Sequence, residues 1–276
     1  MMHRIAKCRM ASAPPVVLSI AGSDSSAGAG VQADLKTISA LGGYGVCAVT
    51  SVVSEAPGKV SRIQHLDPAL ISDQIQVLDG AFPIAAAKTG MIGNRDQLEH
   101  IIRAWSPLAG RGVPLVVDPV MIATSGTRLM DEEAMALMAS GLFPVARVIT
   151  PNLDEAAALL RSKISSRAEM EQGAHELERR HGCAVLVKGG HLSGDAVSDV
   201  LVVKGESRWY ESRRIPGVRT HGTGCTLSAA IATGLAQGRS LDDAVARAKQ
   251  FVSAAIADFH RWGQTDALNH FAQPRV

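Results

Sequence analysis

Short apolar segments alternate with longer segments of helical periodicity along almost the whole chain. Most of the apolar segments lack strict alternation of apolar and polar residues, so we expect both faces of their sheet to be covered, as in parallel sheets. This order of elements predicts an α/β fold with a mostly parallel central sheet flanked by helices. The expected strands are Val16–Ile20, Val46–Val53, Ile84–Thr89, Leu115–Val120, Arg147–Thr150, Val185–Lys188 and Val200–Val203. The expected helices are Val31–Leu41, Pro68–Leu78, Asp96–Trp105, Glu132–Ala139, Asp154–Leu160, Arg167–His181, Cys225–Gln237 and Leu241–Arg261.

The 276 residues contain no internal repeat and no convincing linker. We therefore predict one domain over residues 14–266, a disordered tail over residues 1–13 and a C-terminal tail over residues 267–276. A net charge of +2 is too small to indicate a nucleic-acid partner. No apolar segment reaches the length of a membrane span, so we expect no membrane partner. The cysteines form no C-x-x-C pair, which favours a cytoplasmic location.

A glycine-rich segment over residues 22–30 follows the first expected strand. Open α/β sheets bind ligands at the carboxyl ends of their strands, and glycines let a backbone approach a ligand closely. Gly28 and Gly30, with Ala33, also match the dinucleotide fingerprint of nicotinamide-dependent dehydrogenases, although several residues separate them from the strand. A ligand-binding loop, a dehydrogenase site and a connection without a ligand all remain open for this segment.

Polar residues follow three of the later strands. Asp118 ends an apolar strand, where a buried acid needs a cation, a ligand donor or a turn as its partner. Asn152 and Glu155 lie three residues apart, so they can hold hydrated Mg²⁺ with its phosphate ligands or form a capping box. Lys188 precedes two glycines and can meet a phosphate or extend along the sheet edge.

The segment His221–Ala230, with the sequence HGTGCTLSAA, opens a long apolar helix. Gly222 and Gly224 free the backbone where the first N–H groups of the helix lack partners, which predicts an anion hole. Cys225 lies at its mouth. A free thiol has a pKa of about 8.5, and a helix N-terminus lowers it, so Cys225 can accept a proton from a hydroxyl. Alternatively, Cys225 is a small buried hydrophobic residue.

These segments together resemble the hydroxymethylpyrimidine/phosphomethylpyrimidine kinases of the ribokinase-like superfamily. The resemblance covers nearly the whole chain after the first dozen residues. It implies a three-layer ribokinase-like fold in which ATP and the pyrimidine meet over the strand ends. The matching segments are residues 21–36, 88–93, 117–126, 150–160, 187–192 and 221–230.

The resemblance implies an ATP-dependent kinase of thiamine biosynthesis. Such an enzyme phosphorylates the hydroxymethyl group of 4-amino-5-hydroxymethyl-2-methylpyrimidine, then phosphorylates the monophosphate, and is a homodimer. Cys225 is then the base, with Gly222, Thr223 and Gly224 forming the anion hole. The residues implied for the pyrimidine are Ala29, Asp34, Glu55, Met91 and Val120. The residues implied for ATP are Lys188, Asn152 and Thr223, and those for Mg²⁺ are Asp118, Asn152 and Glu155.

Glu55 departs from the glutamine that is usual in the family. A glutamine offers an aminopyrimidine one donor and one acceptor, whereas an ionised glutamate offers only acceptors. Glu55 fits a ligand whose ring nitrogen is protonated, or one that presents two donors. A pyridoxal/pyridoxine kinase, or a kinase of a related heteroaromatic alcohol, is therefore the alternative function.

Overall fold

The computed structural model describes residues 13–121, 129–190, 192, 194–218 and 221–272. The tail expected over residues 1–13 lies outside these residues except for its last position. The final four residues of the expected C-terminal tail, residues 122–126 of one motif and residue 191 of another also lie outside them. None of the helices in the described ranges has both the length and the apolar character needed to span a lipid bilayer.

The described residues form a nine-stranded sheet in the order β3-β2-β1-β4-β5-β6-β7-β8-β9, together with a separate hairpin. The pairs from β2 through β7 are parallel, while β3, β8 and β9 pair antiparallel at the two edges. The strands are β1 Val16–Asp24, β2 Tyr44–Ala56, β3 Lys59–His65, β4 Ile84–Thr89, β5 Leu115–Val117, β6 Val148–Ile149, β7 Ala184–Lys188, β8 Ala196–Val203 and β9 Glu206–Arg213, and the hairpin is β10 His260–Trp262 and β11 Thr265–Ala267.

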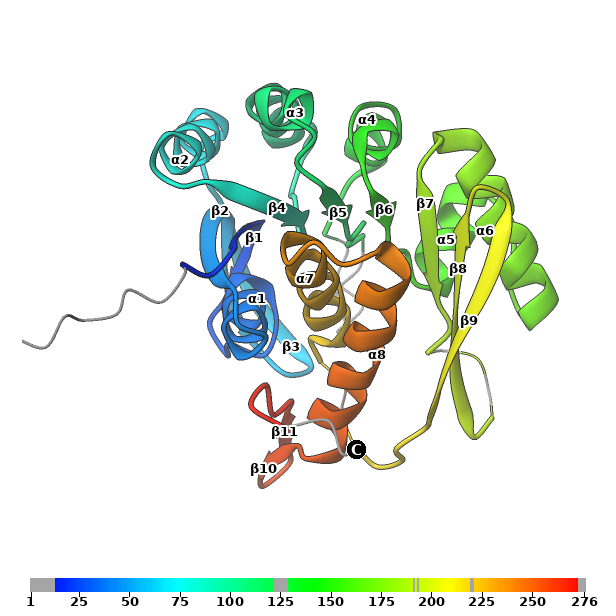
Figure 1. Cartoon of the computed structure of the whole chain (residues 1–276). Helices are drawn as coiled ribbons and strands as arrows, with labels where there is room; N and C mark the ends of the chain where they lie inside the picture. The colour runs from blue at the N-terminus through cyan, green and yellow to red at the C-terminus, as the bar shows by residue number, and fades with distance from the viewer. Residues whose placement is uncertain (1–12, 122–128, 191, 193, 219–220, 273–276) are drawn as a thin grey trace, which may run out of the picture.

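Helices cover both faces of the sheet, as Figure 1 shows. On one face α2, α3 and α4 bury apolar side chains against the strands, and α1, α7 and α8 do so on the other. The two faces have separate apolar clusters, which confirms the predicted three-layer α/β fold. The helices are α1 Gly30–Ala40, α2 Pro68–Ala81, α3 Arg95–Gly110, α4 Glu132–Gly141, α5 Leu153–Leu160, α6 Arg167–His181, α7 Thr223–Ala236 and α8 Leu241–Ala257, with a 3₁₀ turn over Phe143–Val145.

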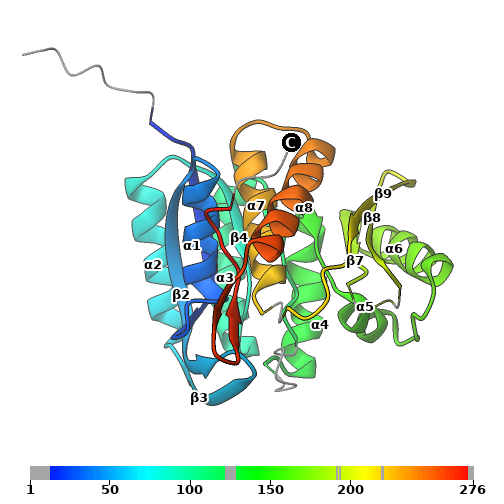
Figure 2. The same cartoon turned by 90° about the horizontal axis from the view of Figure 1, so that it is seen from below.

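The outermost strands β3 and β9 were absent from the sequence prediction, whereas β8 was expected as Val200–Val203. Strands β3 and β9 are mostly exposed or half-buried and carry many charged residues, so they lack the continuous apolar pattern of the central strands. Figure 2 shows that β8 and β9, with α5 and α6, lie at the opposite end of the molecule from β2, β3 and α2.

The last described residues pack against the domain, although the sequence predicted a tail from residue 267. Leu268, His270 and Ala272 are buried. The Nε2 atom of His270 lies 3.1 Å from Oγ1 of Thr226 in the first turn of α7. Helix α8 also ends at Ala257, before the predicted Arg261, which belongs to the hairpin strand β10.

Candidate active site

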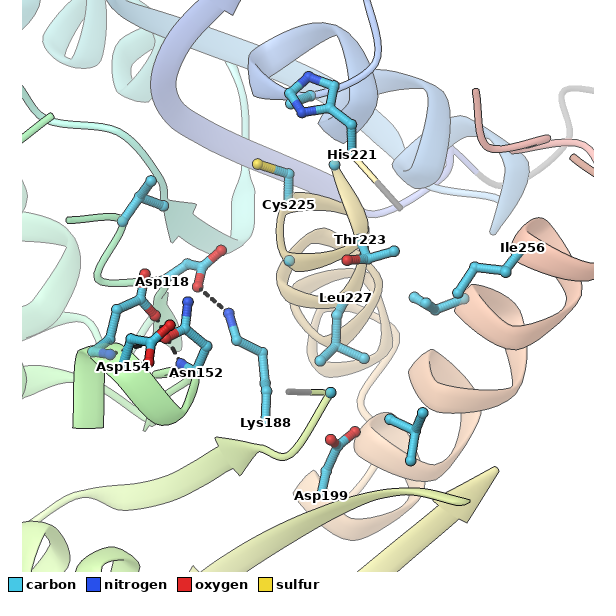
Figure 3. Close-up of a pocket in the computed structure, with 18 of the residues that line it drawn as sticks. Asp118, Asn152, Asp154, Lys188, Asp199, His221, Thr223, Cys225, Leu227 and Ile256 are labelled. Carbon is cyan, nitrogen blue, oxygen red and sulfur yellow. Dashed lines mark hydrogen bonds and ion pairs between the residues drawn. The ribbon is translucent and has the colours of Figure 1, made fainter. Parts of the chain in front are cut away.

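A cavity of about 850 Å³ lies at the carboxyl ends of the parallel strands. The ends of β1, β5 and β7 contribute Asp24, Asp118 and Lys188, and the first turn of α7 closes another side (Figure 3). Almost all the site residues expected from the sequence line this cavity. They are Ala29, Glu55, Met91, Asp118, Val120, Asn152, Glu155, Lys188, Gly222, Thr223, Gly224 and Cys225.

Asp34 does not line the cavity, which corrects its expected place in the pyrimidine site. Its carboxylate accepts a hydrogen bond of 2.6 Å from Ser19 Oγ and lies 3.1 Å from Lys88 Nζ, with both charged side chains 0% exposed. Burial raises the pKa of Asp34, although Lys88 opposes that shift. Burial alone would lower the pKa of Lys88, but the charge of Asp34 raises it. The Asp34 carboxylate therefore pairs with the buried ammonium group of Lys88.

The start of α7 packs against the glycine-rich loop backbone to backbone. Gly222 is the N-cap residue, with a φ of 84° and no side-chain cap. A Cβ atom on Gly222 would lie 1.9 Å from the carbonyl oxygen of Gly28. Only glycine therefore fits at this position, and the first turn of the helix meets the cavity without a capping side chain.

The sequence prediction of a lowered pKa for Cys225 is wrong. Burial raises the pKa of the thiol to about 11, and the charges of Asp34 and Asp118 add to this effect while Lys88 opposes it. The helix N-terminus does not outweigh these contributions. Cys225 is consequently a neutral thiol near neutral pH in the ligand-free site.

Asp118 and Lys188 form an ion pair that ends in the cavity, as the dashed line in Figure 3 shows. Lys188 Nζ lies 2.8 Å from Asp118 Oδ1, and Thr150 Oγ1 donates to the same oxygen at 3.0 Å. Burial favours the neutral acid, but Lys188 and Lys88 together hold the pKa of Asp118 below its ordinary value. The buried acid thus has a cation as its partner, one of the possibilities that the sequence left open.

Asn152 and Glu155 form the capping box at the start of α5. Glu155 N donates to Asn152 Oδ1 at 2.9 Å, and Asn152 N donates to Glu155 Oε2 at 2.7 Å. Burial raises the pKa of Glu155 to about 7, despite the opposing charge of Lys188. The capping interpretation is confirmed, and both residues still line the cavity.

We expect Asn152→Ala to lower the free energy of unfolding by about 1 kcal/mol, because it removes the cap of α5. Urea unfolding measures this loss. Ser166→Ala is a matched control, since Ser166 caps α6 in the same way and does not line the cavity. Both variants should lose stability, and only Asn152→Ala should change ligand affinity. Unchanged stability of Asn152→Ala would show that this capping box contributes nothing.

His221 and Asp24, whose roles were not expected from the sequence, connect the glycine-rich loop to the start of α7. His221 Nε2 lies 3.1 Å from Asp24 Oδ2. The same carboxylate accepts from the backbone N–H groups of Ser26, Gly28 and Ala29. Burial opposes ionisation, but these hydrogen bonds lower the pKa of Asp24 to about 2. The histidine stands in the HGTG motif, yet no sequence pattern pairs it with a carboxylate 197 residues away.

The residues at the far end of the cavity were also not expected from the sequence. Lys249 Nζ of α8 lies 2.6 Å from Asp199 Oδ2 of β8. The other oxygen of Asp199 accepts a hydrogen bond of 2.9 Å from the N–H group of Gly189, which follows Lys188. Beside this pair, Leu227, Val252 and Ile256 form an apolar wall from α7 and α8.

Comparison with known proteins agrees with this geometry. A family model described as phosphomethylpyrimidine kinase matches residues 24–269. The chain belongs to the phosphomethylpyrimidine kinase family. It is therefore a phosphotransferase, and the dehydrogenase alternative does not apply to the glycine-rich loop.

Relatives of this kinase family cover most of the chain. A hydroxymethylpyrimidine/phosphomethylpyrimidine kinase of Rhizobium meliloti is 40% identical over 263 residues, covering 90% of this chain and 98% of the relative. The thiamine biosynthesis bifunctional protein ThiED of Geobacter sulfurreducens is 42% identical, but the chain spans only 49% of its length and 87% of this chain is covered. The pyridoxal kinase of Bacillus subtilis, solved as an ADP complex, is 31% identical with a TM-score of 0.86, covering 94% of this chain and 98% of that one.

Proposed function

We propose that this protein transfers the γ-phosphoryl group of ATP to the hydroxymethyl group of 4-amino-5-hydroxymethyl-2-methylpyrimidine, and then to the resulting monophosphate, in thiamine biosynthesis. The observation that carries the proposal is the meeting of three groups in one cavity: the Cys225 thiol, the uncapped start of α7 and the Asp118–Lys188 pair. An acceptor for the hydroxyl proton, an anion hole and a cation are what phosphoryl transfer needs.

The pyrimidine occupies the end of the cavity beside β1 and β2 in this proposal. Ala29, Glu55, Met91 and Val120 line that end and surround a flat ring with mostly apolar contacts. Cys225, in its thiolate form, accepts the proton of the hydroxymethyl group. The first-turn amides of α7, beginning at Gly222, stabilise the charge on the transferred phosphoryl group.

ATP occupies the other end of the cavity. Lys188, Asn152 and Thr223 hold its phosphates, and the apolar wall of Leu227, Val252 and Ile256 covers its base. Lys188 suits this role because its ammonium group sits at the end of β7, where a phosphate can replace part of its contact with Asp118.

The oxygen donors near the phosphates fit Mg²⁺. Asp118, Asn152 and Glu155 supply carboxylate and amide oxygens at the cavity wall. Mg²⁺ usually keeps several waters and binds through one or two carboxylates plus substrate phosphates. Asp118, Asn152 and Glu155 already accept hydrogen bonds within the protein. In this proposal they therefore contact the ion partly through its bound waters. The ion would neutralise charge on the phosphates when bound.

The substrate is tested by comparing two alcohols, since the related structure from Bacillus subtilis is a pyridoxal kinase. Purified protein with ATP and Mg²⁺ should release ADP with a kcat/KM for the pyrimidine alcohol about tenfold or more above that for pyridoxal, because pyridoxal lacks the ring amino group that pairs with the Glu55 carboxylate. A preference for pyridoxal would overturn the proposed substrate and leave the kinase assignment intact.

The proposed enzyme is a cytoplasmic homodimer. Its described cysteines Cys47, Cys183 and Cys225 are free thiols, which suits a reducing compartment. The exposed apolar side chains of Tyr44 and Val52 on β2 offer surface for a second copy. Sedimentation equilibrium measures the mass of the assembly in solution, and a monomer at micromolar concentration would contradict this part of the proposal.

A further inference from the structure

Glu55 carries a carboxylate whose hydrogen-bonding capacity is open toward the cavity. Its backbone is fixed, because Ser25 Oγ accepts from Glu55 N and donates to Glu55 O, each at 2.8 Å. Its side chain is 12% exposed and lines the cavity. Within the described part of the chain its carboxylate accepts no hydrogen bond, and the nearest basic atom, His221 Nε2, lies 3.8 Å away. The position is rigid, but the acceptor atoms remain available to a ligand.

The carboxylate of the neighbouring Asp24, unlike that of Glu55, accepts several hydrogen bonds within the protein. It accepts from Ser26, Gly28 and Ala29 and from His221. The carboxylates of Asp24 and Glu55 and the imidazole of His221 lie within 4.8 Å of one another, a spacing that a metal ion can bridge. The hydrogen bonds that Asp24 already accepts make it a poor metal ligand. Glu55 alone in this cluster offers oxygens to an incoming molecule.

The electrostatic surroundings favour a proton at Glu55. Burial raises the pKa of its carboxyl group, the negative charge of Asp24 adds to this, and His221 opposes it. On the paired strand β3, Val60 stands opposite Glu55 and lines the cavity. The basic residues Lys59 and Arg62 of β3 are paired with Ala56 and Ser54, and the charges that act on the Glu55 carboxyl group are those of Asp24 and His221. Asp24 and His221 are therefore the charged groups that face Glu55.

We propose that Glu55 recognises the aminopyrimidine by sharing one proton with its ring nitrogen, so that ligand binding takes up one proton from solution. This inference rests on the proposed function. The exocyclic amino group donates to one carboxylate oxygen, and the shared proton lies between the other oxygen and the ring nitrogen. Without that proton, an ionised carboxylate and a ring lone pair face each other as two acceptors. With it, two parallel hydrogen bonds form. A hydrogen bond in which the donor or acceptor is ionised is stronger than one between neutral groups.

The proton count does not depend on which partner holds the proton. A neutral carboxylic acid beside a neutral ring contains as many protons as a carboxylate beside a protonated ring. Above the pKa of both free partners, the complex holds one proton that the separate partners lack. The dissociation constant must then rise about tenfold for each unit of pH. Below the pKa of free Glu55 the acid already carries the proton, and the dissociation constant becomes independent of this group.

Calorimetric titration of the full chain with 4-amino-5-hydroxymethyl-2-methylpyrimidine tests the inference without turnover. Binding heats in two buffers of different ionisation enthalpy, at a pH above neutrality, give the number of protons taken up. We expect one proton for the unaltered protein and a dissociation constant about tenfold higher for each further unit of pH. In Glu55→Gln the amide supplies both a donor and an acceptor, so we expect no proton uptake and a constant affinity over the same range.

Glu133→Gln is a matched control, because Glu133 is exposed on α4 and does not line the cavity. It should bind as the unaltered protein does, with the same proton uptake. Binding by the unaltered protein without proton uptake overturns the inference and leaves the proposed function standing. Equal proton uptake in Glu55→Gln also overturns it, because another group then supplies the proton. Absence of binding in every form at every pH overturns the proposed substrate itself.

Discussion

Replacing Cys225 by alanine is expected to lower kcat by about 10²–10⁴-fold while the dissociation constants for ATP and the alcohol change little. The thiol stands at the start of α7 and faces the cavity. Removal of a proton acceptor slows only the chemical step, whereas the contacts that bind both substrates remain. Single-turnover rates and equilibrium binding, measured on the same preparation, separate the two effects.

The pH dependence of kcat gives a second readout for Cys225. Burial raises the pKa of the thiol to about 11 in the free site. Because the reactive form is the thiolate, its fraction rises about tenfold for each pH unit below that value, so kcat of the unaltered enzyme should rise with pH. Cys225→Ala should lose this slope.

Cys183→Ala is the matched control, since Cys183 is buried before β7 and does not line the cavity. It should keep its kcat and its pH slope, although the cavity left in the core lowers its stability. If Cys225→Ala turned over at the unaltered rate, the thiol would be a packing residue and another group would accept the proton.

Cys225 rests as a neutral thiol, and it must lose its own proton before it can accept that of the hydroxyl. An anion at the start of α7 would repel the incoming phosphate and compete for Lys88, which lies close enough to lower the pKa of Cys225. In a loose transition state the hydroxyl keeps its proton until late in the transfer. The thiolate is therefore needed as proton acceptor only late, when the γ-phosphoryl group is already moving.

The central architecture was predictable from the sequence because the parallel strands are buried on both faces. That burial produces continuous apolar segments such as those of β4 and β7, which stand out in any part of the chain. The edge strands β3 and β9 escaped prediction because their exposed faces carry charged residues. The packed segment after residue 267 escaped prediction for a similar reason. Isolated apolar residues such as Leu268 are buried there, and they form no continuous apolar segment.

Site residues could be predicted from the sequence where a polar residue stands at the end of an apolar strand. Asp118 and Lys188 each follow an apolar strand, and parallel strands bring their ends together. Asp34 could not be assigned in this way, because only the folded chain shows that Lys88 reaches it beneath the cavity. The pKa of Cys225 depends on the same hidden charges, so a rule based on the helix end alone gave the wrong direction.

Gly222→Ala tests whether the contact between the glycine-rich loop and α7 shapes the anion hole. The variant suffers two separate effects. An alanine at a φ of 84° is strained by about 1–2 kcal/mol. Its Cβ atom would also lie 1.9 Å from the carbonyl oxygen of Gly28, so one of the two backbones must move. Displacement of an anion-hole donor lowers kcat by about 10²–10³-fold, which is the expected result.

Gly238→Ala separates the strain from the displacement. Gly238 follows the other end of α7 and has a φ of 76°, but a Cβ atom there meets nothing within 4 Å. Both variants should lose free energy of unfolding in urea, Gly222→Ala the more because of its added clash, and only Gly222→Ala should lose turnover. If kcat fell equally in both, the loss would reflect general destabilisation of α7. If it fell in neither, the amides at the start of the helix would not hold the transferred phosphoryl group, and the site of phosphoryl transfer would have to lie elsewhere in the cavity.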